Sequence, residues 1–253
     1  MKVPASGMSA DAAAIESALR ALGTPERAVS EKAYLKSGLE FAGTSLPATR
    51  STVTAWLKDR PGLDHDDLLA VVRALWDRPV FECRMAAVEF LDAKAALLHS
   101  GDAVLVESML RAARTWALVD NLAANVMGQL TERCPELATT LDSWAADEDF
   151  WLRRSAMLAL LRPLRRGEGD FARFARYADQ MLDEKEFFIR KAIGWILRDT
   201  ASRRPQLVAE WLAPRVDRAS GVTMREAVKP LPADLRDRLL AGYREKRPVT
   251  LGT

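Results

Sequence analysis

The segment WLRRSAML, residues 151–158, recurs in altered form along the chain at intervals close to 35 residues. Its fourth residue, Arg154, aligns with five other positions, and the six follow one another at steps of 34, 35, 35, 37 and 34 residues. Such a period is typical of a solenoid in which each repeat is a pair of helices. The aligned segments are PATRSTVT (47–54), FECRMAAV (81–88), WALVDNLA (116–123), WLRRSAML (151–158), FIRKAIGW (188–195) and VTMREAVK (222–229).

The sequence around these segments also favours helices. Helix starts are indicated by Thr24 before Pro25, by Asp64 before an apolar run and by Pro135. No segment alternates apolar and polar residues between turn signals, so no strand is expected. We expect helices at about 9–22, 25–37, 47–59, 65–78, 81–98, 102–113, 117–132, 136–146, 149–165, 171–183, 186–201, 205–213, 221–229 and 233–246.

Paired helices joined by short connections are similar to HEAT repeats. Solenoids grow by adding repeats, so a chain of 253 residues is compatible with one continuous domain. We therefore expect a single all-α domain over residues 1–253, with its repeat core at about 25–230 and flexible ends. In such a stack, neighbouring helices lie roughly 8–10 Å apart.

The composition limits the classes of function. Hydrophobic residues make up 49% of the chain and charged residues 28%, which is ordinary for a globular protein. Because the formal net charge is only +2, a polyanionic partner has to be held by local clusters of basic residues. This argues against tight, indiscriminate binding of nucleic acids.

Cysteine and histidine usage gives a second limit. Cys83 and Cys134 lie in helical patterns far apart in sequence, which indicates reduced thiols in a cytoplasmic protein. The chain has only two cysteines and two histidines, His65 and His99, so we expect no zinc site and no cofactor. The N-terminus lacks the apolar core of a signal peptide, and no uncharged run reaches the ~18 residues of a membrane span. A cytoplasmic monomer without membrane contact follows as the expectation.

The aligned fourth positions form a basic column. Five of the six are basic, and the exception, Val119, is followed by Asp120. A single acid within a column of cations suggests a reactive centre in an anion-binding surface. The alternative is a structural ladder, in which each cation pairs with an acid of the next repeat. The basic members of the column are Arg50, Arg84, Arg154, Lys191 and Arg225.

Neighbouring residues favour the anion-binding interpretation at two positions. Arg153 doubles the charge beside Arg154, and Arg190 doubles it beside Lys191. Aromatic residues are interleaved with these cations, as in grooves that follow a phosphate backbone and stack on bases or sugars. These aromatic residues are Trp151, Phe187, Phe188 and Trp195.

Trp116 and Asp120 are spaced i, i+4, which places an indole and a carboxylate side by side on one helix face. Trp195 and Lys191 have the same spacing. A carboxylate near indoles attracts a cation, because aromatic faces favour positive charge. The alternative here is that Trp116 anchors the core and Asp120 pairs with Arg154.

Four of these segments carry a family resemblance. The chain resembles the DNA alkylation repair glycosylases of the HEAT-like-repeat type, the AlkD-like family, from about residue 25 to 230. The resemblance implies a right-handed superhelical solenoid with a concave DNA-binding face. It rests on AYLKSGLEFAGTSLPATR (33–50), TWALVDNLA (115–123), WLRRSAMLALL (151–161) and EFFIRKAIGWILRD (186–199).

The resemblance also implies roles for individual residues. Asp120 matches the family's catalytic carboxylate and Arg154 its essential arginine, while Trp116 and Trp195 match its sugar-contacting indoles. Thr115 departs from the family, which often has a second Trp there. Residues expected to contact DNA are Tyr34, Arg50, Arg84, Arg153, Phe187, Phe188, Arg190, Lys191 and Arg225.

The implied chemistry is consistent with a single carboxylate. A purine alkylated at N3 or N7 carries positive charge, so it departs as a neutral base without a general acid. The sugar becomes oxocarbenium-like, as in glycoside hydrolysis, and Asp120 could stabilise that cation and align water. We expect a glycosylase that excises 3-methyladenine, 7-methylguanine and bulkier cationic purines from duplex DNA without enclosing the base.

Two other functions stay open at this stage. A non-catalytic relative would recognise damaged or branched DNA by its shape. A protein-interaction scaffold, a common use of HEAT-like repeats, would carry apolar or acidic residues where the column has Arg84, Arg154 and Lys191.

Overall fold

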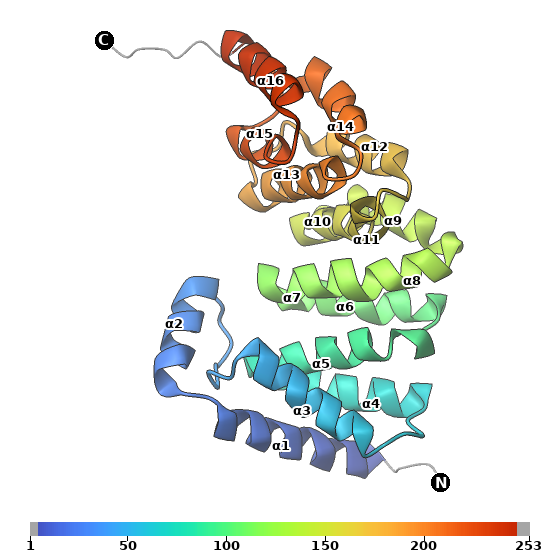
Figure 1. Cartoon of the computed structure of the whole chain (residues 1–253). Helices are drawn as coiled ribbons and strands as arrows, with labels where there is room; N and C mark the ends of the chain where they lie inside the picture. Colours follow the sequence, from blue (N-terminus) through green and yellow to red (C-terminus); the bar gives the residue numbers. More distant parts are fainter. Residues whose placement is uncertain (1–4, 247–253) are drawn as a thin grey trace. The chain divides into compact units, whose positions relative to one another are not determined.

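The computed structural model describes residues 5–246 and is helical along most of this length (Figure 1). Within the described residues, extended pairing is limited to one isolated bridge between Glu40 and Val80. The all-helical expectation is confirmed. The expected flexible ends, residues 1–4 and 247–253, lie outside the described residues.

The chain forms two compact units, Met1–Leu130 (unit 1) and Thr131–Thr253 (unit 2). Helix pairs continue through both units, and a single repeat domain stays a prediction. No helix among residues 5–246 has the length and apolarity needed to cross a membrane.

Unit 1 is built from paired helices stacked in chain order. Helix α4 packs against α5 and α1, and α3 packs against α5 and α1, while α6 packs against α7. The helices are α1 (Ala5–Leu22), α2 (Pro25–Leu35), α3 (Leu46–Lys58), α4 (His65–Trp76), α5 (Phe81–Ala93), α6 (Ala103–Ala113) and α7 (Trp116–Asn121); a π-helical segment (Leu122–Met127) follows, and α8 (Gly128–Arg133) spans the boundary between the units.

Unit 2 repeats the same arrangement. Helix α13 is central and contacts α10, α11, α14 and α15, while α14 also contacts α16. The helices are α9 (Ala138–Ala145), α10 (Phe150–Leu158), α11 (Leu161–Arg165), α12 (Phe171–Met181), α13 (Phe187–Ala201), α14 (Pro205–Leu212), α15 (Gly221–Ala227) and α16 (Ala233–Lys246).

Side-chain caps define many of the helix starts. Thr24 caps α2 by accepting a hydrogen bond from the Arg27 amide, and Asp64 caps α4 through the Asp67 amide at 2.9 Å. Both starts are those expected from the sequence. Pro135 instead opens a short 3-10 turn that leads into α9.

The structure divides one expected helix, 149–165, at residues 159–160. Pro163 explains the break, because a proline has no amide hydrogen and its ring clashes with the carbonyl four residues earlier, here Ala159. The expected helix 81–98 likewise ends at Ala93 and continues only as a 3-10 turn.

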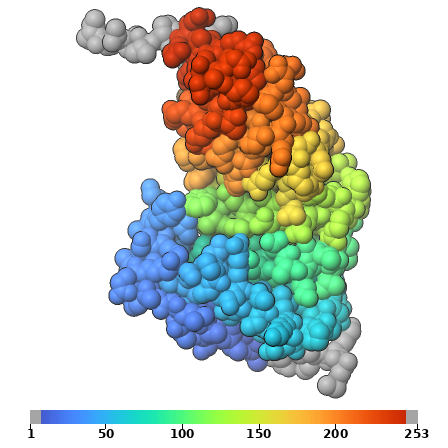
Figure 2. All heavy atoms as spheres, in the orientation of Figure 1, coloured from blue at the N-terminus to red at the C-terminus, as the bar shows by residue number. Residues whose placement is uncertain are grey.

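Helix α2 stands at the edge of unit 1, in blue in the space-filling view (Figure 2). None of its residues is buried. The loop after it is held by Glu82 of α5, whose buried carboxylate accepts hydrogen bonds from the amides of Ala42, Gly43 and Thr44 at 2.9, 2.6 and 3.2 Å. Glu82 therefore fixes the segment that positions α2.

Charged side chains join successive repeats at the repeat spacing. In a series of ion pairs that includes the five named below, the basic residue and its carboxylate lie between 31 and 39 residues apart in sequence. A pairing at this separation requires the two repeats to be in register. The pairs are Arg50 with Glu89, Arg153 with Glu184, Lys191 with Glu226, Arg215 with Asp179 and Arg218 with Asp183.

Glu226 is the most heavily shared of these carboxylates. It is buried and binds Lys191 at 2.8 Å, Lys229 at 2.9 Å and Arg198 at 2.6 Å. Hydrogen bonds from Lys191 and Lys229 lower the pKa of Glu226 to about 2. A depressed carboxyl pKa stabilises the fold above the unfolded-state value and loses that effect as the pH falls through the folded-state value.

We predict that Glu226→Gln destabilises the protein at neutral pH by about 1.5–3 kcal/mol, the scale of hydrogen bonds to charged groups. The difference from the wild type should shrink as the pH falls from about 4.3, the ordinary glutamate pKa, toward about 2. Urea unfolding at several pH values measures it. Glu210→Gln, at an exposed position of the same unit, is the control. A difference that does not change with pH would contradict the linkage.

Candidate functional site

The first candidate site lies on α7 of unit 1. Trp116 is the first residue of this helix and Asp120 follows one turn later, and both side chains are partly exposed. Because residues 116–121 are α-helical, the indole and the carboxylate share one helix face, as the spacing predicted. Thr115 precedes them and is buried with a hydroxyl that makes no hydrogen bond.

A π-helical segment, Leu122–Met127, begins two residues after Asp120. Such segments are rare and often occur at functional sites. Next to it, a polar row runs along the same helix: the Asn125 amide donates to Asn121 at 3.2 Å, and the Gln129 amide donates to Asp92 of the preceding repeat at 2.7 Å. The sequence offered no signal for the change in helix type.

A pocket of about 230 Å³ opens beside Trp116 within unit 1. Tyr34 of α2 meets the Trp116 ring edge-on, with ring centroids 5.8 Å apart, and is 71% exposed. The pocket therefore has an aromatic rim. Its lining residues are Glu31, Tyr34, Leu35, Thr44, Leu46, Thr49, Phe81, Glu82, Met85, Trp116, Ala117 and Asn121.

The second group of candidate residues lies in unit 2, at the starts of α10 and α13. Arg154 is only 2% exposed, and its guanidinium donates a hydrogen bond to the Phe188 carbonyl and lies 5.9 Å from the Phe188 ring centroid. Phe188 also packs on Trp151, with centroids 4.9 Å apart. Phe187 contacts Phe188 and is 54% exposed.

Trp195 lies two turns into α13. Its indole nitrogen donates to Asp199 at 3.1 Å, and Asp199 also pairs with Arg165 at 2.6 Å. Lys191, on the same helix face, points its ammonium group to Glu226. The indole and the lysine thus have separate partners within unit 2.

Most of the basic column makes contacts with the following repeat. Arg50 pairs with Glu89, and Arg84 donates to the Ala112 carbonyl while lying 5.1 Å from the Trp76 ring centroid. Lys191 and Arg154 make the corresponding contacts in unit 2. Arg50 and Lys191 therefore make the ion pairs that a structural ladder predicts, whereas Arg84 and Arg154 donate to backbone carbonyls of the next repeat. A role of these residues in DNA binding stays a prediction.

Three further basic positions differ in their environment. Arg153 is tied to Glu184 by two hydrogen bonds, and Arg190 donates to the Glu184 carbonyl at 2.6 Å. Arg225 is exposed and, among residues 5–246, forms no ion pair. It is therefore the member of the column whose charge is most available to a ligand.

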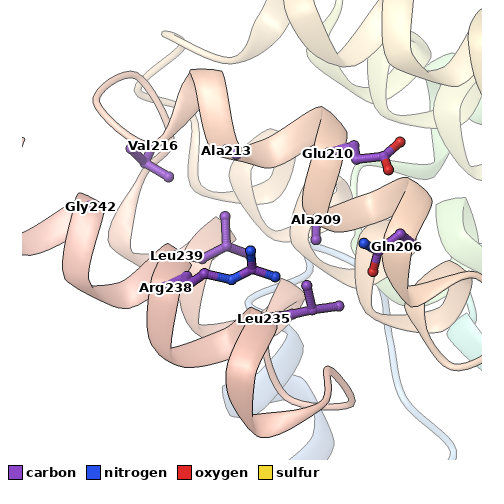
Figure 3. A pocket seen from close by; sticks show the side chains of 9 residues that line it. All are labelled: Gln206, Ala209, Glu210, Ala213, Val216, Leu235, Arg238, Leu239 and Gly242. Carbon is purple, nitrogen blue, oxygen red and sulfur yellow. The ribbon is translucent and has the colours of Figure 1, made fainter.

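Two other pockets lie within unit 2. One lies between α14 and α16, where Leu235, Arg238 and Leu239 face Gln206 and Glu210 (Figure 3). The other is bordered by Thr131 and Arg173. Neither contains a residue that the sequence analysis assigned to catalysis or DNA binding.

Sequence reasoning missed part of the aromatic surroundings. Phe81 and Met85 line the pocket beside Trp116, and Phe150 stacks 4.4 Å from Trp151. Phe81 stands first in its repeat segment, as Trp116 does in its own, so the alignment itself contained this signal.

Comparison with known proteins agrees with the arrangement of helices. A predicted DNA alkylation repair enzyme from Enterococcus faecalis has a TM-score of 0.75 at 24% identity, covering 83% of this chain and 97% of that one. AlkD2 from Streptococcus mutans has a TM-score of 0.59 at 16% identity, covering 83% of this chain and 100% of that one. These likenesses establish the fold. Among curated proteins, no match was found.

The sequence itself matches a family model described as DNA alkylation repair enzyme. The match covers residues 15–231, which includes α7, α10, α13 and the repeat segments between them. With the helical fold and the match in agreement over most of its length, the chain belongs to the DNA alkylation repair enzyme family.

Proposed function

We propose that this protein is a DNA glycosylase that removes cationic N3- and N7-alkylated purines from duplex DNA by hydrolysing the N-glycosidic bond. The observation that carries the proposal is that Asp120 and Trp116 lie one turn apart on the same face of α7. A partly exposed carboxylate one turn from an indole suits a developing positive charge.

The reaction requires little acid–base machinery. An alkylated purine is already cationic, so the electrons of the glycosidic bond return to the ring and the base leaves uncharged. Positive charge then develops on the deoxyribose, where the Asp120 carboxylate stabilises it and orients the attacking water. The water adds to the anomeric carbon and loses one proton to solvent.

The surroundings of Trp116 support an open site. The pocket in unit 1 is smaller than the roughly 300 Å³ at which typical ligand pockets begin. Tyr34 at its rim offers a ring face to a sugar or base edge, and the peripheral helix α2 leaves that ring exposed. Bulky adducts are compatible with such a site.

Unit 2 contributes a surface suited to a sugar–phosphate backbone. At the starts of α10 and α13, Phe187 is exposed and Phe188 is partly exposed, and the partly exposed Arg153 lies in the same group of residues as the buried Arg154. Aromatic rings alternating with cations bind nucleic acid backbones with little regard to sequence. We assign phosphate contacts in the basic column first to Arg225, because its side chain is exposed and its charge also has no ion-pair partner among the described residues.

The substrate range tests the proposal directly. The protein should release 7-methylguanine and 3-methyladenine from methylated duplex DNA, and it should leave hypoxanthine and uracil in place, because neutral bases require a general acid. Chromatography of the released bases measures this. Efficient release of hypoxanthine would show that the mechanism is wrong, and no release of any base would favour a non-catalytic DNA-binding protein.

The role of Asp120 is tested by Asp120→Asn. Loss of the charge should slow base release by roughly 10²-fold or more, the scale of removing a positioned charge or base. DNA binding and thermal unfolding should change little, since the side chain keeps its size. Single-turnover kinetics give the rate, and Asp59→Asn, the same change at an exposed position of unit 1, is the control that should keep the wild-type rate. Wild-type rates in Asp120→Asn would remove this carboxylate from the mechanism.

Arg225→Gln tests the phosphate contact. The slope of log K against log salt concentration should become less steep by about one unit, because one fewer counterion is released. Arg238→Gln, an exposed arginine of α16 outside the column, should leave the slope unchanged. Equal slopes for the wild type and Arg225→Gln would place Arg225 away from the DNA.

A further inference from the structure

The two histidines of this chain lie together with one aspartate in unit 1. His65 is the first residue of α4, His99 precedes the short 3-10 turn that leads into α6, and Asp102 is the last residue of that turn. The imidazole rings are stacked, with centroids 4.6 Å apart. Stacking from successive repeats therefore brings together residues up to 37 positions apart in sequence.

The distances in this cluster match those between ligands of one metal ion. Two ligands bound to zinc at about 2.0–2.1 Å with tetrahedral angles lie about 3.3 Å apart. Here His65 Nε2 lies 3.0 Å from Asp102 Oδ2, and His99 Nδ1 lies 3.6 Å from the same oxygen. The observed distances bracket the expected value.

The third separation, between the two imidazole nitrogens, is also short. All three donor atoms lie within 4.8 Å of one another. For all three atoms to bind one ion, the His99 ring has to shift. Its side chain is 65% exposed, so it has room to move. Asp102 is 6% exposed and provides the fixed point of the site.

Outer hydrogen bonds orient the donors. The second ring nitrogen of His65, Nδ1, lies 3.4 Å from a carboxylate oxygen of Asp66, the kind of partner that holds the ring of a metal-binding histidine. Asp102 Oδ2 accepts a hydrogen bond from the His99 amide at 2.8 Å. The carboxylate is thus held in place before any ion binds.

We propose that His65, His99 and Asp102 form a binding site for a divalent transition-metal ion, with Zn²⁺ as the representative. Two imidazoles and one carboxylate suit Zn²⁺, Ni²⁺, Co²⁺ or Cu²⁺, whereas Mg²⁺ and Ca²⁺ favour oxygen ligands alone. Three protein ligands leave at least one coordination position for water.

This site is separate from the residues proposed to act on DNA. Helix α5 begins with Phe81, which lines the pocket beside Trp116, and ends with Ala93, shortly before His99. A helix of this length spans about 18 Å. The metal site therefore lies near the other end of α5 from the pocket and plays no part in the glycosylase proposal.

Binding of the ion would join the repeat that contains α4 to the repeat that contains α6. A ligand that binds only the folded state stabilises it in proportion to its occupancy. The buried Cys83 does not compete for the ion, because burial raises its thiol pKa to about 12. The expected effect is a rise in the unfolding temperature of the protein with added Zn²⁺.

The experiment is a titration of tag-free, chelator-treated full-length protein with Zn²⁺, followed by calorimetry. One ion should bind per chain, and the unfolding temperature should rise. Because the chain has only two histidines, both imidazole signals in the proton NMR spectrum report on this cluster, and both should shift. Mg²⁺ in excess should neither shift them nor compete with Zn²⁺.

Variants assign the ligands. His99→Gln, at an exposed position, and His65→Gln should each weaken Zn²⁺ binding by roughly 100-fold or more, beyond the roughly 10- to 100-fold effect of losing an outer partner. Asp67→Asn removes a carboxylate from the same turn without removing a donor, and should bind Zn²⁺ like the wild type. Absence of binding, or wild-type affinity in the double histidine variant, would overturn the proposal and leave the cluster as a hydrogen-bonded cap of the 3-10 turn Ser100–Asp102.

Discussion

The register between successive helix pairs is the constraint on which this structure depends. A helix pair cannot bury its apolar face alone, so each repeat covers the face left open by the one before it. Ion pairs and hydrogen bonds also connect each repeat to the next. Arg154, almost fully buried, donates a hydrogen bond to the backbone of the next repeat at Phe188, and a slip of one residue in the register would break this contact.

This constraint makes the basic column compatible with a structural role and with the proposed role in binding anions. A cation that reaches the next repeat stabilises the stack, as Lys191 does with Glu226 and Arg50 with Glu89. The same side chains are 40% and 50% exposed, so part of each remains at the surface. One set of residues can therefore form a ladder of ion pairs and also present positive charge at the surface. The members of the column differ in how much of their charge is available to a ligand.

The candidate catalytic residues and the aromatic ring beside them are held in place in different ways. Asp120 and Trp116 lie on a helix held by the repeats of unit 1, and the π-helical segment begins two residues after Asp120. Tyr34 comes from α2, which buries none of its residues and is held through the loop bound by Glu82. A fixed carboxylate beside an exposed aromatic ring suits a reaction in which the protein stabilises charge and does not enclose the base.

The sequence by itself determined the repeat period, the helical class, nearly all helix positions and the shared face of Trp116 and Asp120. These features depend on local patterns: caps such as Thr24 and Asp64, apolar periodicity and i, i+4 spacing. Only the tertiary structure decided which cations are tied to acids and that His65, His99 and Asp102 meet. Contacts between residues more than thirty positions apart depend on how neighbouring repeats pack, and no local pattern encodes that packing.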